Sequence, residues 1–242
     1  MTPPYGPAKL VEFPRLVDLI NRDPAVQEVV HLGDIKDGSS VCSDGYFATV
    51  RALFDTFEDP FIFTPGDNEW TDCHRSNNGP FFPLERLDAL RRTFYPVLGQ
   101  TLGVNKKQVL SQSAEPGFGQ FVENQLWFES RVAFAALNIP GSNNNRAPWT
   151  NVTPAQAAQQ PQEYQARLAA TIAWLNKTFA LAISERASGV VLMLQADMWD
   201  TFATNLTGFT PVVQRMPAWP EPSGNLSSCS RGTRTPSGSI AR

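Results

Sequence analysis

The stretch that decides the fold is "HLGDIKDG" (residues 31–38), and "TPGDNEW" (residues 64–70) repeats its pattern. In each, an apolar run ends in a glycine that is followed directly by an aspartate. Glycine allows the backbone to turn sharply and lets another group approach closely. If both runs are strands, Asp34 and Asp67 are delivered to the same edge of a sheet.

The segments around these stretches alternate between helical and extended patterns. The apolar spacing predicts helices over 13–23, 46–57 and 83–96, with buried strands over 27–33 and 60–64 between them. Alternation of this kind favours parallel strands and a layered α/β fold.

The middle of the chain follows a different pattern. The extended runs 119–130 and 131–141 meet with almost no connection, which predicts an antiparallel hairpin. A long helix follows, with apolar residues from Tyr164 to Phe179 on one face, and 189–197 is expected to be another buried strand. We therefore expect mixed sheets.

The expected strand ends carry oxygen- and amide-bearing side chains in addition to the two aspartates. Asn143 and Asn144 follow Gly141, and Gln195 lies near the end of 189–197. Two carboxylates brought together repel each other unless a cation lies between them, and oxygen ligands suit divalent metals. A single Gly-Asp pair is explained as well by a turn or a helix cap, but two pairs favour a metal site.

Composition narrows the classes of function. The chain has 242 residues, 42% of them hydrophobic, and a net charge of −3, which suits one globular domain and makes nucleic acid an unexpected partner. No apolar run is long enough for a membrane helix. The opening "MTPPYGPAKL" lacks the apolar core of a signal peptide, so the chain as given is expected in the cytoplasm, with export of a longer form left open. Cys42 and Cys73 each follow one Gly-Asp stretch, and both a disulfide and two reduced thiols fit the sequence.

The motifs resemble those of the calcineurin-like metallophosphoesterase superfamily, in a variant similar to purple acid phosphatases. "GDIKD" (33–37) looks like the family's Gly-Asp motif, and "GDNE" (66–69) looks like its Gly-Asn-His-Asp/Glu motif. The resemblance spans roughly residues 5–213 and implies a layered α/β/β/α sandwich. It also implies a metal-dependent phosphoester hydrolase acting on a small-molecule phosphoester. In that family two divalent ions (Mn, Fe or Zn) hold a hydroxide that attacks phosphorus.

The resemblance assigns metal ligands by position. Asp34 falls where the family has its metal-bridging aspartate, and Asp67 occupies the place of a ligand asparagine. Tyr5 matches the tyrosine of a Gly-Asp-x-x-Tyr motif whose beginning is absent. Gln195 stands where a ligand histidine is usual, so it is assigned to the substrate side of the site.

The resemblance also assigns catalytic roles. Asn68 occupies the position of the histidine that protonates the leaving oxygen, and Glu69 matches the acid that orients this histidine. His74 is either a displaced acid or a histidine of the loop surface. Trp70 either lines the substrate entrance or packs beneath its loop. "SNNNR" (142–146) either brings Asn143, Asn144 and Arg146 to a phosphate or is a plain polar loop.

Both ends of the chain depart from the family pattern. The first strand and the last core strands are expected to be missing, so residues 1–214 form an incomplete domain, and the Pro- and Ser-rich residues 215–242 are expected to be disordered or foreign to the fold. The departures at Asn68 and Gln195 leave an alternative open, a non-catalytic relative that binds a ligand or partner through a degenerate metal site. A glycosidase is disfavoured because Asp67 and Glu69 lie on one loop.

Overall fold

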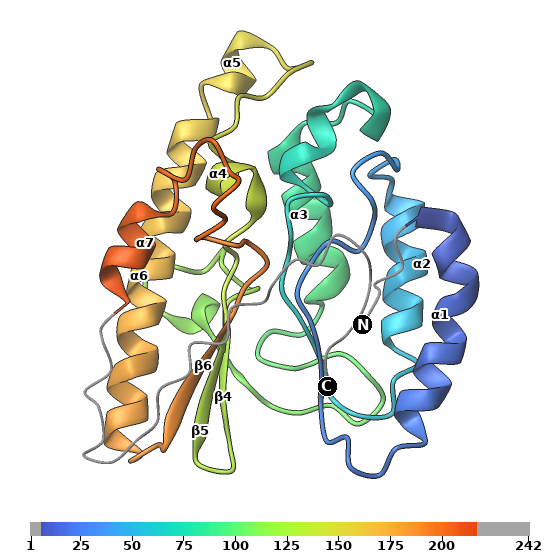
Figure 1. Cartoon of the computed structure of the whole chain (residues 1–242), viewed down its shortest axis with the longest axis vertical. Coiled ribbons are helices and arrows are strands. Elements are labelled where there is room, and N and C mark those ends of the chain that lie inside the picture. Colours follow the sequence, from blue (N-terminus) through green and yellow to red (C-terminus); the bar gives the residue numbers. More distant parts are fainter. Residues whose placement is uncertain (1–5, 217–242) are drawn as a thin grey trace.

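A computed structural model describes residues 6–216 and shows a mixed α/β fold (Figure 1). Its strands are short, and its helices carry most of the regular structure. In chain order, the elements are α1 (Gly6–Asn21), β1 (Val29–His31), α2 (Asp44–Phe54), β2 (Phe61–Phe63), the 3-10 helices η1 (Thr71–His74) and η2 (Ser76–Asn78), α3 (Pro83–Phe94), β3 (Leu110–Ser111), η3 (Gln112–Ala114), β4 (Gln125–Glu129), β5 (Val132–Ala136), α4 (Gly141–Asn145), α5 (Pro154–Ala157), α6 (Gln160–Ser184), β6 (Gly189–Met193) and α7 (Thr210–Arg215).

Two sheets organise the described residues. β1 and β2 pair in parallel, with Val29 opposite Phe61. The second sheet has the order β3-β4-β5-β6, in which β4 and β5 form an antiparallel hairpin and β5 and β6 run parallel. Ser130 and Arg131 form the turn of the hairpin with positive φ angles of 47° and 64°, the backbone that matches the twist of the paired strands. The predicted hairpin and mixed sheet are confirmed.

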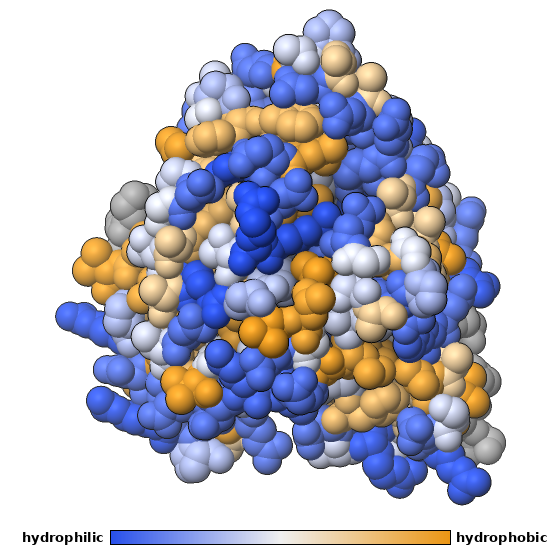
Figure 2. Space-filling model, turned by 180° about the vertical axis from the view of Figure 1, so that it is seen from behind, coloured by the Kyte–Doolittle hydropathy of each residue, from blue (hydrophilic) through white to orange (hydrophobic). Residues whose placement is uncertain are grey.

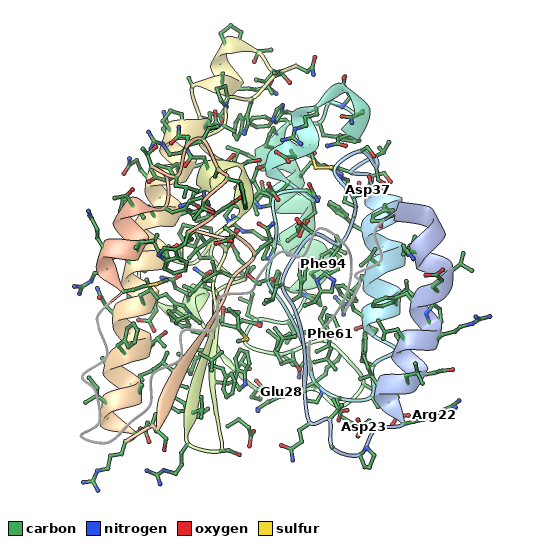
Figure 3. The ribbon with its side chains drawn as sticks, in the orientation of Figure 1. Arg22, Asp23, Glu28, Asp37, Phe61 and Phe94 are labelled. Atoms are coloured by element: carbon green, nitrogen blue, oxygen red, sulfur yellow. A yellow bond between two sulfur atoms is a disulfide. The ribbon has the colours of Figure 1, made fainter. Side chains whose placement is uncertain are left out.

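Three apolar clusters hold the layers together. Alternate residues of β2 face opposite sides: Phe61 and Phe63 pack towards α1, α2 and α3, whereas Ile62 packs towards Trp127 of the second sheet. The third cluster lies between the second sheet and α6 and α7. In Figure 1, α1 and α2 lie on one side of the strands, and α6 and α7 lie on the other. In Figure 3, the side chain of Arg22 projects outward, whereas Phe61 lies in the interior.

Helix α2 ends three residues and α3 ends two residues before the predicted ends, and α1 differs more. α1 begins at Gly6 and continues through Pro14, which was expected in the first turn. Proline removes one hydrogen bond from a helix interior. Packing of the apolar face of α1 in the cluster around Phe61 and Phe63 offsets that loss. The expected boundary between 214 and 215 is wrong by at least one residue, because it falls inside α7, where Arg215 donates to Asn176 at 2.8 Å. The rest of the predicted tail, from residue 217 on, lies outside the described residues.

Cys42 and Cys73 form a disulfide, which decides between the two alternatives left open by the sequence. Both sulfur-bearing side chains are fully buried. The bond joins the loop after β1 to η1, which follows β2. It therefore ties together the two Gly-Asp segments.

Among the described residues, no helix is both long enough and apolar enough to cross a bilayer. On the face seen in Figure 2, hydrophobic side chains gather in several separate patches among hydrophilic ones.

Candidate functional site

A cavity of about 360 Å³ opens at the carboxyl ends of β1, β2, β5 and β6. This is the place where open α/β sheets bind ligands. The predicted meeting of the strand ends is confirmed. The lining comprises Leu32, Gly33 and Asp34 after β1, Asp67 after β2, Gly141, Ser142 and Asn143 after β5, Gln195, Ala196 and Asp197 after β6, and Asp200, Ala203, Asn205, Leu206 and Phe209 before α7.

Asp34 and Asp67 converge on one side chain in this cavity. The amide nitrogen of Gln195 donates to Oδ2 of Asp34 at 3.1 Å and to Oδ1 of Asp67 at 3.2 Å. The amide oxygen of Gln195 accepts a hydrogen bond from the backbone of Gly141 at 2.6 Å. The two carboxylates therefore lie within reach of a single amide group, as the sequence predicts. Their role as metal ligands stays a prediction.

The glycines of the Gly-Asp motifs make this convergence sterically feasible. A Cβ on Gly66 would lie 2.3 Å from Oδ1 of Asp34, and a Cβ on Gly141 would lie 2.4 Å from Oδ2 of Asp67. Gly33 has a φ of +73°, and its own Cβ would lie 2.2 Å from the nitrogen of Gly66. Any larger residue at these positions would push the carboxylates or the two loops apart.

Burial and the charges of neighbouring carboxylates raise the pKa values of three acids in and behind the cavity, Asp34, Glu69 and Asp72. Burial, with the charges of Glu69 and Asp67, raises the pKa of Asp34 to about 8. Burial raises the pKa of Glu69 to about 7 against the lowering effect of a hydrogen bond from Gly66. Burial and the charge of Asp67 raise the pKa of Asp72 to about 6. Such crowding of carboxyl groups is relieved when a cation is bound among them.

Two residues predicted to be catalytic, Glu69 and Asn68, do not line the cavity. Glu69 is fully buried, and its Oε1 accepts hydrogen bonds from the backbone of Gly66 at 2.6 Å and of Asp34 at 3.1 Å. The side chain of Asn68 donates to the carbonyl of Lys36 at 3.1 Å. Both side chains join the loop after β1 to the loop after β2, which is a positioning arrangement, and their catalytic roles stay predictions.

The third residue predicted to be catalytic, His74, also lies outside the cavity. It is buried, with its Nδ1 2.9 Å from the backbone nitrogen of Thr150 and 3.0 Å from its hydroxyl oxygen. Burial lowers the pKa of His74. The imidazole therefore joins η1 to the loop at Thr150. Of the two alternatives left open by the sequence, neither a displaced acid in the site nor a histidine on the loop surface fits this position.

The "SNNN" run forms a left-handed helical turn. Ser142, Asn143, Asn144 and Asn145 all have positive φ, between 49° and 59°, and the backbone nitrogen of Arg146 closes the turn on the carbonyl of Ser142 at 3.1 Å. Asparagine tolerates this backbone better than most residues, which explains three asparagines in a row.

The turn brings only one of its predicted substrate residues to the cavity. Asn143 lines it and accepts from the backbone of Gly208 at 2.8 Å. Asn144 is buried against Arg167, and exposed Arg146 lies over the ring of Tyr164. Neither Asn144 nor Arg146 lines the cavity, because the turn directs them elsewhere, and a phosphate contact of Arg146 stays a prediction.

Trp70 is fully buried and does not line the cavity. Its ring lies under the guanidinium of Arg167 at 5.4 Å. Of the two alternatives, packing beneath the loop is correct and the substrate entrance is wrong. Tyr5, the remaining predicted ligand, lies outside the described residues.

Sequence reasoning missed a polar relay behind Asp67. The hydroxyl of Ser142 lies 3.0 Å from Oδ2 of Asp67 and 2.7 Å from Oδ1 of Asp72. Oδ2 of Asp72 pairs with Arg75 at 2.9 Å. Ser142 directly follows the glycine at the end of an extended run, so its position was a usable signal. Asp72 sits in an irregular segment and carried no such signal.

The donors in the cavity are hard oxygen ligands, which suit a divalent cation. They are the carboxylates of Asp34 and Asp67 with neutral oxygens nearby, the ligand chemistry preferred by Mg²⁺, Mn²⁺ and Ca²⁺. The described residues contain no group of three or more His, Cys, Asp or Glu side chains arranged for a metal. The chain has two histidines, His31 and His74, and neither lines the cavity.

Comparisons of the chain with protein-family models, with curated proteins and with solved structures each found no match. The resemblance to metallophosphoesterases therefore rests on the motifs and on the geometry of the cavity.

Proposed function

We propose that this chain is a relative of the calcineurin-like metallophosphoesterases, with their α/β/β/α sandwich, and that it hydrolyses small-molecule phosphoesters with a divalent cation. The observation that carries the proposal is the convergence of Asp34 and Asp67, from two Gly-Asp motifs, on one point in a cavity at the strand ends. Two carboxylates in contact with one amide are a favourable place for a cation.

The lining of the cavity supports a requirement for that cation. It contains four aspartates, Asp34, Asp67, Asp197 and Asp200, and none of the described residues that line it is a lysine or an arginine. A phosphoester anion would be repelled by this lining on its own. When bound, a divalent cation would neutralise phosphoryl oxygens and activate water. The chain's own contribution is to fix Asp34 and Asp67 through Gln195, Ser142 and the backbone clamps of Glu69.

A second candidate is a non-catalytic relative that binds a ligand through the cation without turnover. The amide of Gln195 lies between the two carboxylates where the family usually has a ligand histidine. None of the described lining residues is a histidine able to protonate a leaving group. These two features are the observations that favour the second candidate.

Two measurements test the proposals in the full chain. Calorimetric titration with Mn²⁺, Mg²⁺ or Zn²⁺ should show binding that D34N and D67N each weaken at least about tenfold, the loss expected when a carboxylate ligand becomes a neutral amide. D18N, which alters an exposed aspartate on α1, is the matched control and should bind like the wild type. Cation-dependent hydrolysis of p-nitrophenyl phosphate would support the first candidate, the phosphoester hydrolase.

The outcomes separate the two candidates. Cation and phosphate binding without hydrolysis supports the non-catalytic relative. The absence of cation binding, or equal binding by the wild type and D34N, contradicts both candidates.

A further inference from the structure

Lys36 is a buried cation directly beside the proposed site. Its side chain is fully buried, although lysine is among the residue types most often exposed. Its Nζ donates to the carbonyls of Asp37 at 2.8 Å and of Asn68 at 2.9 Å, and no carboxylate lies within ion-pair distance of it among the described residues. A buried ammonium held only by backbone carbonyls requires a further electrostatic reason.

The surrounding acids supply that reason. Glu69 and Asp72 are buried in the same region, with Asp34 and Asp67 at the cavity. Arg75, the ion-pair partner of Asp72, is 45% exposed, so solvent screens its charge more than that of Lys36. Lys36 is thus a fully buried positive charge in a region of crowded carboxyl groups.

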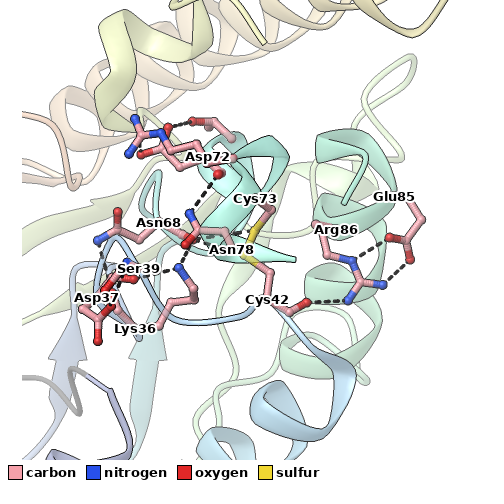
Figure 4. Close-up of a disulfide and its surroundings, with 12 residues drawn as sticks. Lys36, Asp37, Ser39, Cys42, Asn68, Asp72, Cys73, Asn78, Glu85 and Arg86 are labelled. Carbon is pink, nitrogen blue, oxygen red and sulfur yellow. Dashed lines mark hydrogen bonds and ion pairs between the residues drawn. A yellow bond between two sulfur atoms is a disulfide. The ribbon is translucent and has the colours of Figure 1, made fainter. Parts of the chain in front are cut away.

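The hydrogen bonds of Lys36 also join the two motifs. Its Nζ binds the carbonyl of Asn68 on the loop after β2, while its own carbonyl accepts from the side chain of Asn68 at 3.1 Å. The backbone nitrogen of Asn68 approaches Oδ1 of Asp34 at 3.4 Å. Figure 4 shows Lys36 and Asn68 side by side, next to the Cys42–Cys73 disulfide.

We propose that Lys36 is a positioning residue whose charge offsets the carboxylates and holds Asp34 and Asp67 together before a cation binds. This inference rests on the proposed cation site. Lys36 and a bound divalent cation then counter the same negative charge, and they repel each other. Removing the charge of Lys36 should destabilise the cation-free protein and tighten cation binding.

The test compares K36M, which keeps an apolar stem but removes the charge, with K107M. Lys107 pairs with Glu28 and Glu129, none of which lines the cavity, so it is a matched lysine with remote partners. In EDTA both variants should lose Tm. With saturating Mn²⁺, the rise in Tm of K36M should exceed that of the wild type by at least about 3 °C, a shift readily measured in a chain of this size.

The Kd for Mn²⁺ should fall at least about fivefold in K36M and stay unchanged in K107M. A merely structural role of Lys36 predicts the opposite sign, because a loosened site binds the cation more weakly. Equal Tm losses with and without Mn²⁺, or weaker Mn²⁺ binding by K36M, would overturn the inference. If K36M is unfolded in EDTA, recovery of the native circular dichroism on adding Mn²⁺ supports it, and failure to recover while the wild type binds Mn²⁺ counts against it.

A metal-free cycle separates this inference from the proposed function. Asp67→Asn removes a negative charge, so it should raise the Tm of K36M in EDTA by more than it raises that of the wild type. If the wild type binds no cation but this coupling is present, the cation site is wrong and the charge role of Lys36 stands. If Mn²⁺ binds and both the coupling and the tighter binding are absent, Lys36 is not the balancing charge.

Discussion

At the scale of single residues, the hydroxyl of Ser142 is shared between two carboxylates. It lies 3.0 Å from Asp67 and 2.7 Å from Asp72, although a hydroxyl has only one proton to donate. Ser142 therefore holds the two acids at a fixed separation and directs Asp67 into the cavity. This is a positioning role that depends on one atom.

We predict that Ser142→Ala lowers Tm by about 2–4 °C, because the lost hydrogen bonds are worth roughly 1 kcal/mol of unfolding free energy. It should also weaken Mn²⁺ binding about threefold, measured by titration calorimetry. Alanine keeps the Cβ, so the strain of the left-handed turn is unchanged. Ser184→Ala, at the exposed end of α6, is the control for losing a hydroxyl. Unchanged Mn²⁺ binding by S142A would show that Asp67 needs no support from Ser142.

His31 illustrates how packing controls a titration. Its ring lies among Phe54, Phe61 and Phe63, with centroid distances of 5.2, 6.3 and 5.9 Å, and neither ring nitrogen has a partner among the described residues. Burial lowers the pKa of His31 to about 4. In the unfolded chain its pKa is near 6.5, so the unfolded state binds more protons as pH falls below that value. The stabilisation that comes from a neutral His31 is therefore fully present above pH 6.5, and it is lost as the pH falls towards 4.

The prediction for His31→Phe is a protein less sensitive to acid. Urea unfolding at pH 7 and at pH 4.5 should show that the wild type loses about 1–3 kcal/mol more unfolding free energy than H31F over this interval. Equal losses of unfolding free energy in the wild type and H31F would mean that His31 is protonated as easily in the folded state as in the unfolded state.

At the scale of elements, the strand ends approach each other so closely that glycine is required. We predict that Gly66→Ala lowers the unfolding free energy by about 1–3 kcal/mol, because its Cβ would lie 2.3 Å from Oδ1 of Asp34. Gly45→Ala is the matched control in α2, where a Cβ meets nothing within 4 Å. It should stabilise the helix by roughly 0.5–1 kcal/mol. Urea unfolding measures both changes, and similar effects of the two substitutions would refute the close approach.

Periodicity and chain order were sufficient to predict most elements and the meeting of Asp34 with Asp67. Alternating segments fix which strand ends share an edge, whatever the details of the loops. The roles of Asn68 and His74 could not be predicted this way, because each side chain forms a hydrogen bond with a residue of another loop. Asn68 bonds to the carbonyl of Lys36, and His74 bonds to Thr150. Arg146 was misplaced because its turn is left-handed, a feature that motif spacing does not reveal.

At the scale of the whole molecule, the cavity depends on loops from two sheets that no continuous hydrogen-bonded ladder joins. The strand pairs connect β1 to β2 and β3 to β6 separately, so the sheets meet through side-chain packing around Ile62 and Trp127. The Cys42–Cys73 disulfide closes a loop that contains both β2 and Asp67, with a sequence separation of 31 residues. Covalent closure restricts the unfolded chain more than the folded one.

We predict that replacing both cysteines with serine lowers the unfolding free energy by about 2–4 kcal/mol, the range typical for a loop of this size. Urea unfolding of the oxidised protein and of the Cys42→Ser/Cys73→Ser variant measures the difference. Cys229→Ser leaves this pair intact and controls for loss of a thiol. Because the loop carries Asp67, Mn²⁺ binding should weaken in the double variant as well. An unchanged unfolding free energy, or alkylation of all three cysteines in the unreduced denatured protein, would show that the bond does not form in solution.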